Sequence, residues 1–202
     1  MPGLDSAPAV LILWAVIGYA LGSIPFGMVL ARLMGLGNLR EIGSGNIGAT
    51  NVLRTGNKAA AALTLILDGG KGAVAVLLAR NLAGEDAVQI AGLAAFIGHC
   101  YPVWLGFAGG KGVATFLGVL LALAWPVGVA ACLTWLATAA WARLSSLAAM
   151  VAAGSSALWM LVLGQGAGVL LALLLTALIM WRHRGNIARI RDGSEPRIGQ
   201  KN

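Results

Sequence analysis

The sequence has little charge and few of the side chains that hold metals or form disulfide networks. Of its 202 residues, 10% are charged and 59% are hydrophobic, a composition far outside the range of soluble globular domains. Its two cysteines, Cys100 and Cys132, fit neither a disulfide framework nor a metal-site spacing. Only four aspartates occur, and they are widely separated, so we expect no metal. No other cofactor is expected either. These absences exclude a soluble domain and indicate an integral membrane protein.

Long apolar stretches predict an all-α, polytopic helical bundle, because a spanning helix needs about 20 apolar residues. The expected spans are residues 7–34, 59–78, 88–107, 146–163 and 168–181, with two short helices within residues 112–142. The stretch at residues 112–142 is too long for one ordinary span and is split at Trp125 and Pro126. We therefore expect seven transmembrane helices, with five or six as alternatives, in one membrane-embedded domain over residues 1–202.

The cations favour this count, because short apolar hairpins then place most of them on one face. That face receives Arg32, Arg40, Arg54, Lys58, Lys111, Arg143, Arg182, Arg184, Arg189, Arg191, Arg197 and Lys201. The opposite loops hold only Arg80, Glu85 and Asp86, or no charge. By the positive-inside rule, the N-terminus is predicted outside and the C-terminal tail in the cytoplasm. The first apolar run has no preceding Lys or Arg and is expected to be a retained span, not a cleaved signal.

Two glycine-rich polar stretches interrupt the apolar sequence on the predicted cytoplasmic side. They are GSGNIGATNVLR (43–54) and AGGKGVAT (108–115). Glycines let backbone N–H groups turn toward an anion, hydroxyls and amides add donors, and Arg54 and Lys111 supply positive charge. A helix that begins near Val113 would add the favourable end of its dipole. The pattern indicates phosphate binding at a membrane surface.

Simpler explanations compete for several of these residues. The net charge of +7 also follows from topology, and the basic tail can rest on anionic lipid headgroups. Ser44, Asn46 and Asn51 can instead hydrogen-bond their own loop. No nucleic acid is expected, because the cations lie on scattered membrane loops without interleaved aromatic side chains.

A second pair of charges, Asp68 and Lys71, lies well inside the span at residues 59–78. Lone charges at that depth are costly, and a spacing of three suits mutual neutralisation on a helix. We therefore favour a buried ion pair facing the bundle over a direct catalytic role.

Three long motifs together resemble a known family. GSGNIGATNVLR, GHCYPVWLGFAGGKGVAT (98–115) and RHRGNIARIRDGSEPRIG (182–199) are similar, in order and spacing, to the signature motifs of the bacterial acyl-phosphate:glycerol-3-phosphate acyltransferase family, the PlsY family. The resemblance covers essentially the whole chain. It implies transfer of a fatty acyl group from acyl phosphate to the 1-hydroxyl of glycerol 3-phosphate, the first step of phospholipid synthesis.

The resemblance also implies a setting and a set of partners. The expected location is the bacterial cytoplasmic (inner) membrane, with the active site facing the cytoplasm. The partners are the fatty acyl phosphate, glycerol 3-phosphate and membrane lipids, and the protein is expected to be a monomer.

Residue roles follow motif by motif. We expect catalytic roles for Ser44, Arg54, Lys111 and His183. Substrate binding is assigned to Thr50, Asn51, Gly109, Gly110, Gly112, Ser145, Ser146 and Asn186. Glu195 matches the family's acidic position and is expected to tether the tail to a nearby arginine. His99 has a catalytic role or hydrogen-bonds a helix end, and Ser145 and Ser146 contact phosphate or cap a helix.

The mechanism is open between three routes. A His followed five residues later by Asp, as in many thioester-dependent acyltransferases, is absent here. An acyl phosphate is already reactive, so we favour positioning of the substrates and charge stabilisation, with a donor phosphate oxygen taking the proton. The alternatives are general-base catalysis by a histidine and a covalent acyl-Ser44 intermediate.

Two other functions fit the sequence less well. A transporter of a phosphorylated metabolite would place its anion-binding residues near the bilayer midplane between related halves. An alcohol phosphatidyltransferase would need a cluster of metal-binding aspartates.

Overall fold

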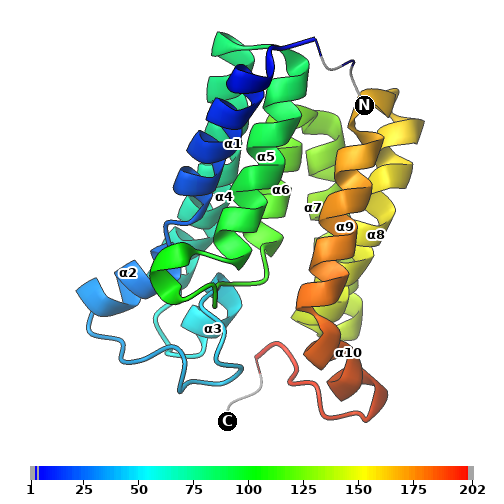
Figure 1. Cartoon of the computed structure of the whole chain (residues 1–202). Helices are drawn as coiled ribbons and strands as arrows, with labels where there is room; N and C mark the ends of the chain where they lie inside the picture. Colours follow the sequence, from blue (N-terminus) through cyan, green and yellow to red (C-terminus); the bar gives the residue numbers. More distant parts are fainter. Residues whose placement is uncertain (1–2, 4, 200–202) are drawn as a thin grey trace. The chain divides into compact units, whose positions relative to one another are not determined.

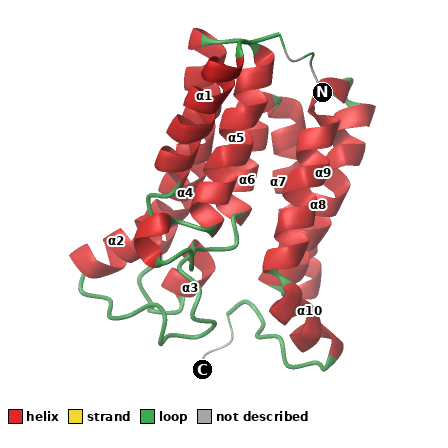
Figure 2. Ribbon diagram, in the orientation of Figure 1, coloured by secondary structure: helices red, strands yellow, loops and turns green. Residues whose placement is uncertain are grey.

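The computed structural model describes residues 3 and 5–199 of the chain, and every regular element in that part is a helix (Figure 2). The predicted tail cation Lys201 lies outside the described residues. The chain divides into two compact units, one reaching Leu123 and one beginning at Ala124. A single functional domain stays a prediction.

The first unit is built on two long helices, α4 and α5, and the elements that pack on them (Figure 1). Its elements are α1 (Pro8–Gly22), α2 (Phe26–Leu33), α3 (Ala49–Leu53), α4 (Lys58–Leu82), α5 (Glu85–Cys100), the 3-10 helix η1 (Val103–Leu105) and α6 (Val113–Leu123). α1 packs along α5, and α4 packs against both α5 and α6. A Cβ at Gly18 or Gly22 would overlap the backbone of Ala91 or Ala95. Glycine at these positions therefore permits the close approach of α1 and α5.

The first predicted span, residues 7–34, consists of two helices with a break between them. Pro25 has no N–H to continue the helical ladder, so α1 ends at Gly22 and α2 begins at Phe26. Side chains from other elements bind the carbonyls of the break. Trp104 Nε1 donates to the Ser23 carbonyl at 2.9 Å, and Lys71 Nζ donates to the Ile24 carbonyl at 2.7 Å.

The second unit is a helical hairpin extended by a third helix and a bent tail. It comprises α7 (Trp125–Ala142), α8 (Ser145–Val162), the 3-10 helix η2 (Gly166–Gly168), α9 (Val169–Arg182) and α10 (Arg184–Arg191). α8 packs against both α7 and α9. α9 and α10 meet at 60°, so the helical path bends at His183.

The lengths and apolar character of the helices fit a polytopic membrane protein. Among the described residues, five helical segments are long and apolar enough to cross a bilayer, or six if the bent pair α9 and α10 is one span. α6 is apolar but shorter. The predicted interruption at Trp125 is confirmed, because α6 ends at Leu123 and α7 begins at Trp125. The polytopic all-α class is confirmed, whereas the count of seven and the orientation stay predictions.

Candidate functional site

The first glycine-rich loop is organised by Asn51, which is 1% exposed. The Asn51 side-chain oxygen accepts from the Ser44 backbone N–H at 3.1 Å and from Arg54 Nη1 at 3.2 Å. Its amide nitrogen donates to the Leu39 carbonyl at 2.9 Å. Asn51, predicted as a substrate contact, thus serves the loop itself and holds Ser44 and Arg54 beside each other.

Gly43 is required by the same arrangement. Its φ of 52° lies in the left-handed region that favours glycine. A Cβ there would lie 2.5 Å from Arg54 Cδ and 2.8 Å from Asn51 Oδ1. Any side chain at Gly43 would therefore displace Arg54, the predicted phosphate clamp.

The second glycine-rich loop caps the end of α5. The Gly109 N–H donates to the Cys100 carbonyl at 3.1 Å, and the Gly110 N–H donates to the His99 carbonyl at 3.0 Å. These two amides thus serve carbonyls at the end of α5, which need donors, and substrate binding by Gly109 and Gly110 stays a prediction. A Cβ at Gly109 would overlap the His99 carbonyl oxygen, and a Cβ at Gly110 would overlap the His99 ring, so both positions need glycine. Lys111 follows directly and is partly exposed.

Gly112 ends this loop in a left-handed conformation, with φ of 81°, where a Cβ would overlap the Phe96 ring. α6 begins at the next residue, Val113, as predicted. The start of α6 therefore lies directly beside Lys111, and its N–H groups add positive potential there.

Arg40 joins the two glycine-rich loops, a role that the sequence did not indicate. One guanidinium nitrogen donates to the Ala108 carbonyl, and the other donates to the Gly45 carbonyl at 3.4 Å. Both loops thus lie at the same end of the first unit. Only the long-range contact identifies Arg40, because in the sequence it is one basic loop residue among several.

The predicted buried ion pair on α4 is confirmed. Lys71 Nζ lies 2.8 Å from Asp68 Oδ1, and the two side chains are each 3% exposed. His99 of α5 lies next to them, with Nδ1 at 3.7 Å from Asp68 Oδ1. Nothing in the sequence related His99 to this pair. In the structure the side chains of Asp68, Lys71 and His99 lie together.

In the second unit, Glu195 gathers three of its neighbours. Its carboxylate accepts from Ser146 Oγ at 2.5 Å, from Asn186 Nδ2 at 2.6 Å and from Arg189 Nε at 2.8 Å. Burial opposes ionisation, but these donors outweigh it and hold the pKa of Glu195 below its usual value. The predicted tether between Glu195 and a nearby arginine is confirmed.

The serines and the histidine of this unit are also placed. α8 has Leu144 as its N-cap and no side-chain cap, so neither Ser145 nor Ser146 caps it as the alternative suggested. His183 Nδ1 lies 2.8 Å from the Ile179 carbonyl. Because a carbonyl only accepts, Nδ1 carries the proton, and in the neutral ring Nε2 is the unprotonated nitrogen. His183 and Asn186 are both buried, at 2% and 5% exposed.

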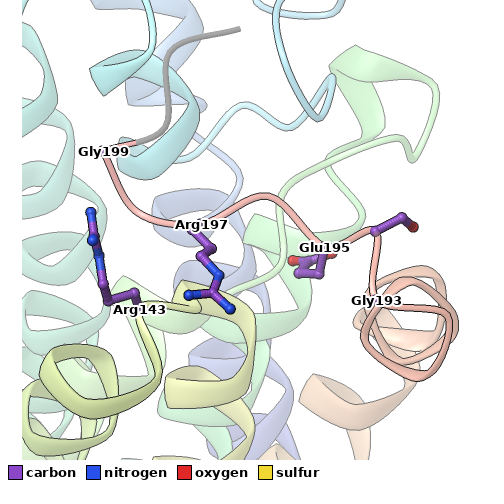
Figure 3. A pocket seen from close by; sticks show the side chains of 6 residues that line it. Arg143, Gly193, Glu195, Arg197 and Gly199 are labelled. Atoms are coloured by element: carbon purple, nitrogen blue, oxygen red, sulfur yellow. The ribbon is translucent and has the colours of Figure 1, made fainter.

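A pocket of about 460 Å³ opens beside Glu195 (Figure 3). Arg143 reaches it from the turn after α7, and Arg197 reaches it from the tail. Arg143 has a left-handed backbone, with φ of 57°, and its Nη2 donates to the Ile198 carbonyl at 3.1 Å. The Ile198 N–H in turn donates to the Arg143 carbonyl at 2.7 Å. The tail is thereby fixed to the turn, and the two arginines give the pocket positive charge.

The structure places the predicted residues in two groups. Ser44, Asn51 and Arg54 lie together in the first unit, where Arg40 ties their loop to the one that carries Lys111. Ser146 and Asn186 meet on Glu195 in the second unit. Among the described residues, no group of three or more His, Cys, Asp or Glu side chains is placed to hold a metal ion. Contact of these residues with substrate stays a prediction.

The chain was compared with known proteins. A family model described as glycerol-3-phosphate acyltransferase matches residues 12–193. A glycerol-3-phosphate acyltransferase of Ruegeria pomeroyi is 70% identical over 201 residues, covering 100% of this chain and 99% of the relative. One of Roseobacter denitrificans is 70% identical over 198 residues, covering 98% of this chain and 99% of the relative.

Two crystal structures of PlsY (YgiH), an integral membrane glycerol 3-phosphate acyltransferase, have a similar fold. The glycerol 3-phosphate form is 43% identical, with a TM-score of 0.88 over 94% of this chain and 96% of that one. The lysophosphatidic acid form is 40% identical, with a TM-score of 0.85 over 94% and 95%. With a family match over most of its length and relatives that align nearly end to end, the chain belongs to the glycerol-3-phosphate acyltransferase family.

Proposed function

We propose that the protein transfers a fatty acyl group from an acyl phosphate to the 1-hydroxyl of glycerol 3-phosphate, giving 1-acylglycerol 3-phosphate and inorganic phosphate. The observation that carries the proposal is the pairing of the two glycine-rich loops by Arg40, which brings the Arg54 and Lys111 segments to one end of the first unit. Both reactants carry a phosphate, and two cationic loops at one end suit them. The glycerol 3-phosphate and lysophosphatidic acid forms of the PlsY relative support this substrate and this product.

Arg54, Ser44 and Lys111 are proposed to act on the phosphates and the reacting carbonyl. Arg54 clamps a phosphate, Ser44 donates a hydrogen bond that positions substrate, and Lys111 stabilises the charge that moves onto the departing phosphate. Thr50, Gly109, Gly110 and Gly112 are proposed to shape this part of the site.

Four residues in the C-terminal part of the chain are proposed to bind glycerol 3-phosphate. Ser145, Ser146, His183 and Asn186 supply hydroxyl, imidazole and amide groups, and the arginine-lined pocket beside Glu195 suits a phosphate.

In the proposed reaction, the 1-hydroxyl oxygen attacks the acyl carbonyl carbon. A carbon–oxygen bond forms to glycerol, and the bond between the acyl carbon and the phosphate oxygen breaks. The hydroxyl proton moves to the departing phosphate, so no protein group is consumed. Because a mixed anhydride is already activated, the protein's task is orientation and charge stabilisation. His183 Nε2 is the alternative proton acceptor, since Nδ1 faces the Ile179 carbonyl.

We further propose a multi-pass protein of the bacterial inner membrane, with seven spans, an exterior N-terminus and the active site at the cytoplasmic face. The cations of both glycine-rich loops and of the tail support this orientation. We propose that it works as a monomer, with membrane lipids around it.

The donor is tested with purified protein in lipid vesicles. One mixture contains acyl phosphate and glycerol 3-phosphate, and the other contains an acyl thioester in place of the acyl phosphate. Lysophosphatidic acid and free phosphate are expected in the first mixture alone. Product from the thioester alone would overturn the proposed donor. The variant Arg54→Met serves as the control for enzyme-dependent product and is expected to make almost none.

A further inference from the structure

A polar chain runs through the interior of the first unit. It starts at the break between α1 and α2, where the Ile24 carbonyl accepts from Lys71 Nζ at 2.7 Å. Lys71 Nζ also contacts Asp68 Oδ1 at 2.8 Å, and the ring of Phe26 covers the ammonium group, with its centroid 5.8 Å away. Asp68 Oδ1 in turn lies 3.7 Å from His99 Nδ1. This last contact is longer than a hydrogen bond, but the polar side chains bring α4 and the last turn of α5 side by side.

This polar chain ends against the loop that carries Lys111. The His99 carbonyl accepts from the Gly110 N–H at 3.0 Å. A Cβ on Gly110 would overlap the imidazole ring of His99, so the loop lies directly on that ring. The position of the imidazole thus determines the path of residues 109–112.

The other side of the loop is fixed to the same turn of α4. Thr115 Oγ1, in the first turn of α6, donates to the Asp68 backbone carbonyl at 2.8 Å. Gly72 of α4 allows this approach, because a Cβ there would lie 2.8 Å from the Thr115 carbonyl oxygen. Residues 109–112 are therefore fixed on both sides. His99, which lies beside the Asp68 carboxylate, packs against Gly110, and Thr115 hydrogen-bonds the Asp68 carbonyl.

Stability alone gives little reason to keep an ion pair at this depth, because well-packed apolar side chains often replace buried pairs without loss. We propose that Lys71, Asp68 and His99 are positioning residues that hold residues 109–112, and with them Lys111, in the geometry that the reaction needs. The inference rests on the proposed role of Lys111. It assigns a function to three residues that do not themselves contact substrate.

The main test removes both charges together, so that neither partner is left alone in the apolar interior. In the variant Asp68→Asn/Lys71→Met, kcat is expected to fall about 100-fold, as displacement of a reacting group by about 1 Å can cause. KM for glycerol 3-phosphate and the thermal unfolding midpoint in detergent are expected to change little. Wild-type kcat in the folded double variant would overturn the proposal.

Thr115→Val is a milder test that adds no charge and nearly conserves volume. It removes the hydrogen bond to the Asp68 carbonyl, and kcat is expected to fall about tenfold. Thr64→Val is the matched control, because Thr64 is also fully buried but its hydroxyl donates to the Ala60 carbonyl of its own helix. Equal kcat values for the two threonine variants would contradict the proposal.

Lys111→Met separates this inference from the proposed function. If Lys111→Met leaves turnover intact, the proposed role of Lys111 fails. If it abolishes most turnover while Asp68→Asn/Lys71→Met does not, the positioning role alone fails. The triple variant Asp68→Asn/Lys71→Met/Lys111→Met is expected to lose no more kcat than Lys111→Met alone, because the polar chain acts through Lys111. A purely structural effect would instead multiply with the loss of Lys111.

Discussion

Asn51 shows how one buried amide sets the position of two candidate site groups. It accepts from Ser44 and Arg54 and donates to the Leu39 carbonyl, which uses both ends of its side chain. An alanine at this position would leave the Leu39 carbonyl without this donor and Arg54 without its anchor.

We predict that Asn51→Ala lowers kcat about 100-fold, because Arg54 loses its fixed orientation. The measurement is steady-state kinetics of the purified enzyme in detergent or lipid. Asn57→Ala is the control, since the Asn57 side chain caps α4 by accepting from the Ala60 N–H at 2.9 Å. That variant is expected to lose about 1 kcal/mol of stability with unchanged kcat. Equal kcat losses in the two asparagine variants would show that Asn51 acts only through stability.

The sequence predicts the identity of these residues better than their contacts. Ser44, Asn51 and Arg54 were recognisable as a group from their composition and motif. The bond from Asn51 to Leu39 was not, because it depends on the path of a glycine-rich loop over twelve residues. The use of the Gly109 and Gly110 amides by α5 was not predictable either, because it depends on how the loop after Pro102 folds back onto the last turn of that helix.

At the level of elements, close helix contact depends on missing side chains. We predict that Gly22→Ala destabilises the protein by about 1–3 kcal/mol, because its Cβ would overlap the backbone of Ala95 on α5. Gly70→Ala in α4 is the matched control, with no atom within 4 Å of its added Cβ. Thermal unfolding in detergent compares the two, and the control is expected to be neutral or slightly more stable. A Gly22→Ala midpoint at or above the wild-type value would contradict the packing of α1 on α5.

The attachment of the tail is predicted to depend on pH. The folded-state pKa of Glu195 lies below its ordinary value of 4.5, so its stabilising effect is complete above that value. The effect disappears as the pH falls through the lowered pKa and the carboxylate takes up a proton. Between about pH 6 and about pH 3.5, the unfolding midpoint of wild-type protein should therefore fall more steeply than that of Glu195→Gln.

Glu85→Gln is the control for this pH series. Glu85 forms a solvent-exposed pair with Arg80, at 3.5 Å, and such pairs contribute little. Its profile is expected to follow the wild type. Parallel profiles for wild type and Glu195→Gln would show that the carboxylate does not hold the tail.

The length of the apolar stretch explains why one helix break was predicted and another, also at a proline, was not. At Trp125 and Pro126 the apolar stretch was too long for one span, so a break was needed, and the structure has it. Around Pro25 the stretch at residues 7–34 fitted a single span, although the structure divides it there. The bend at His183 had no such marker, because neither proline nor glycine precedes it.

For the molecule as a whole, the distribution of cations predicts the orientation in the membrane. In a background with Cys100→Ala and Cys132→Ser, a cysteine at Ser194 should react with an impermeant maleimide from the cytoplasmic side only. A cysteine at Glu85 should react from the exterior only, because the turn between α4 and α5 carries few cations. Labelling in right-side-out and inverted vesicles makes the comparison. Reaction of both cysteines from one side would overturn the predicted topology.

The interruption between α1 and α2 has a consequence for how the sequence can vary. Because the helix is interrupted there, the Ile24 carbonyl can accept a hydrogen bond from Lys71 Nζ on α4. If a replacement of Pro25 made the first span one continuous helix, the Ile24 carbonyl would bond within that helix. The Lys71 ammonium group would then have one acceptor fewer in an apolar environment. Pro25 and Lys71, although far apart in the sequence, are therefore expected to vary together. A replacement of Pro25 is tolerated only if Lys71 is replaced at the same time.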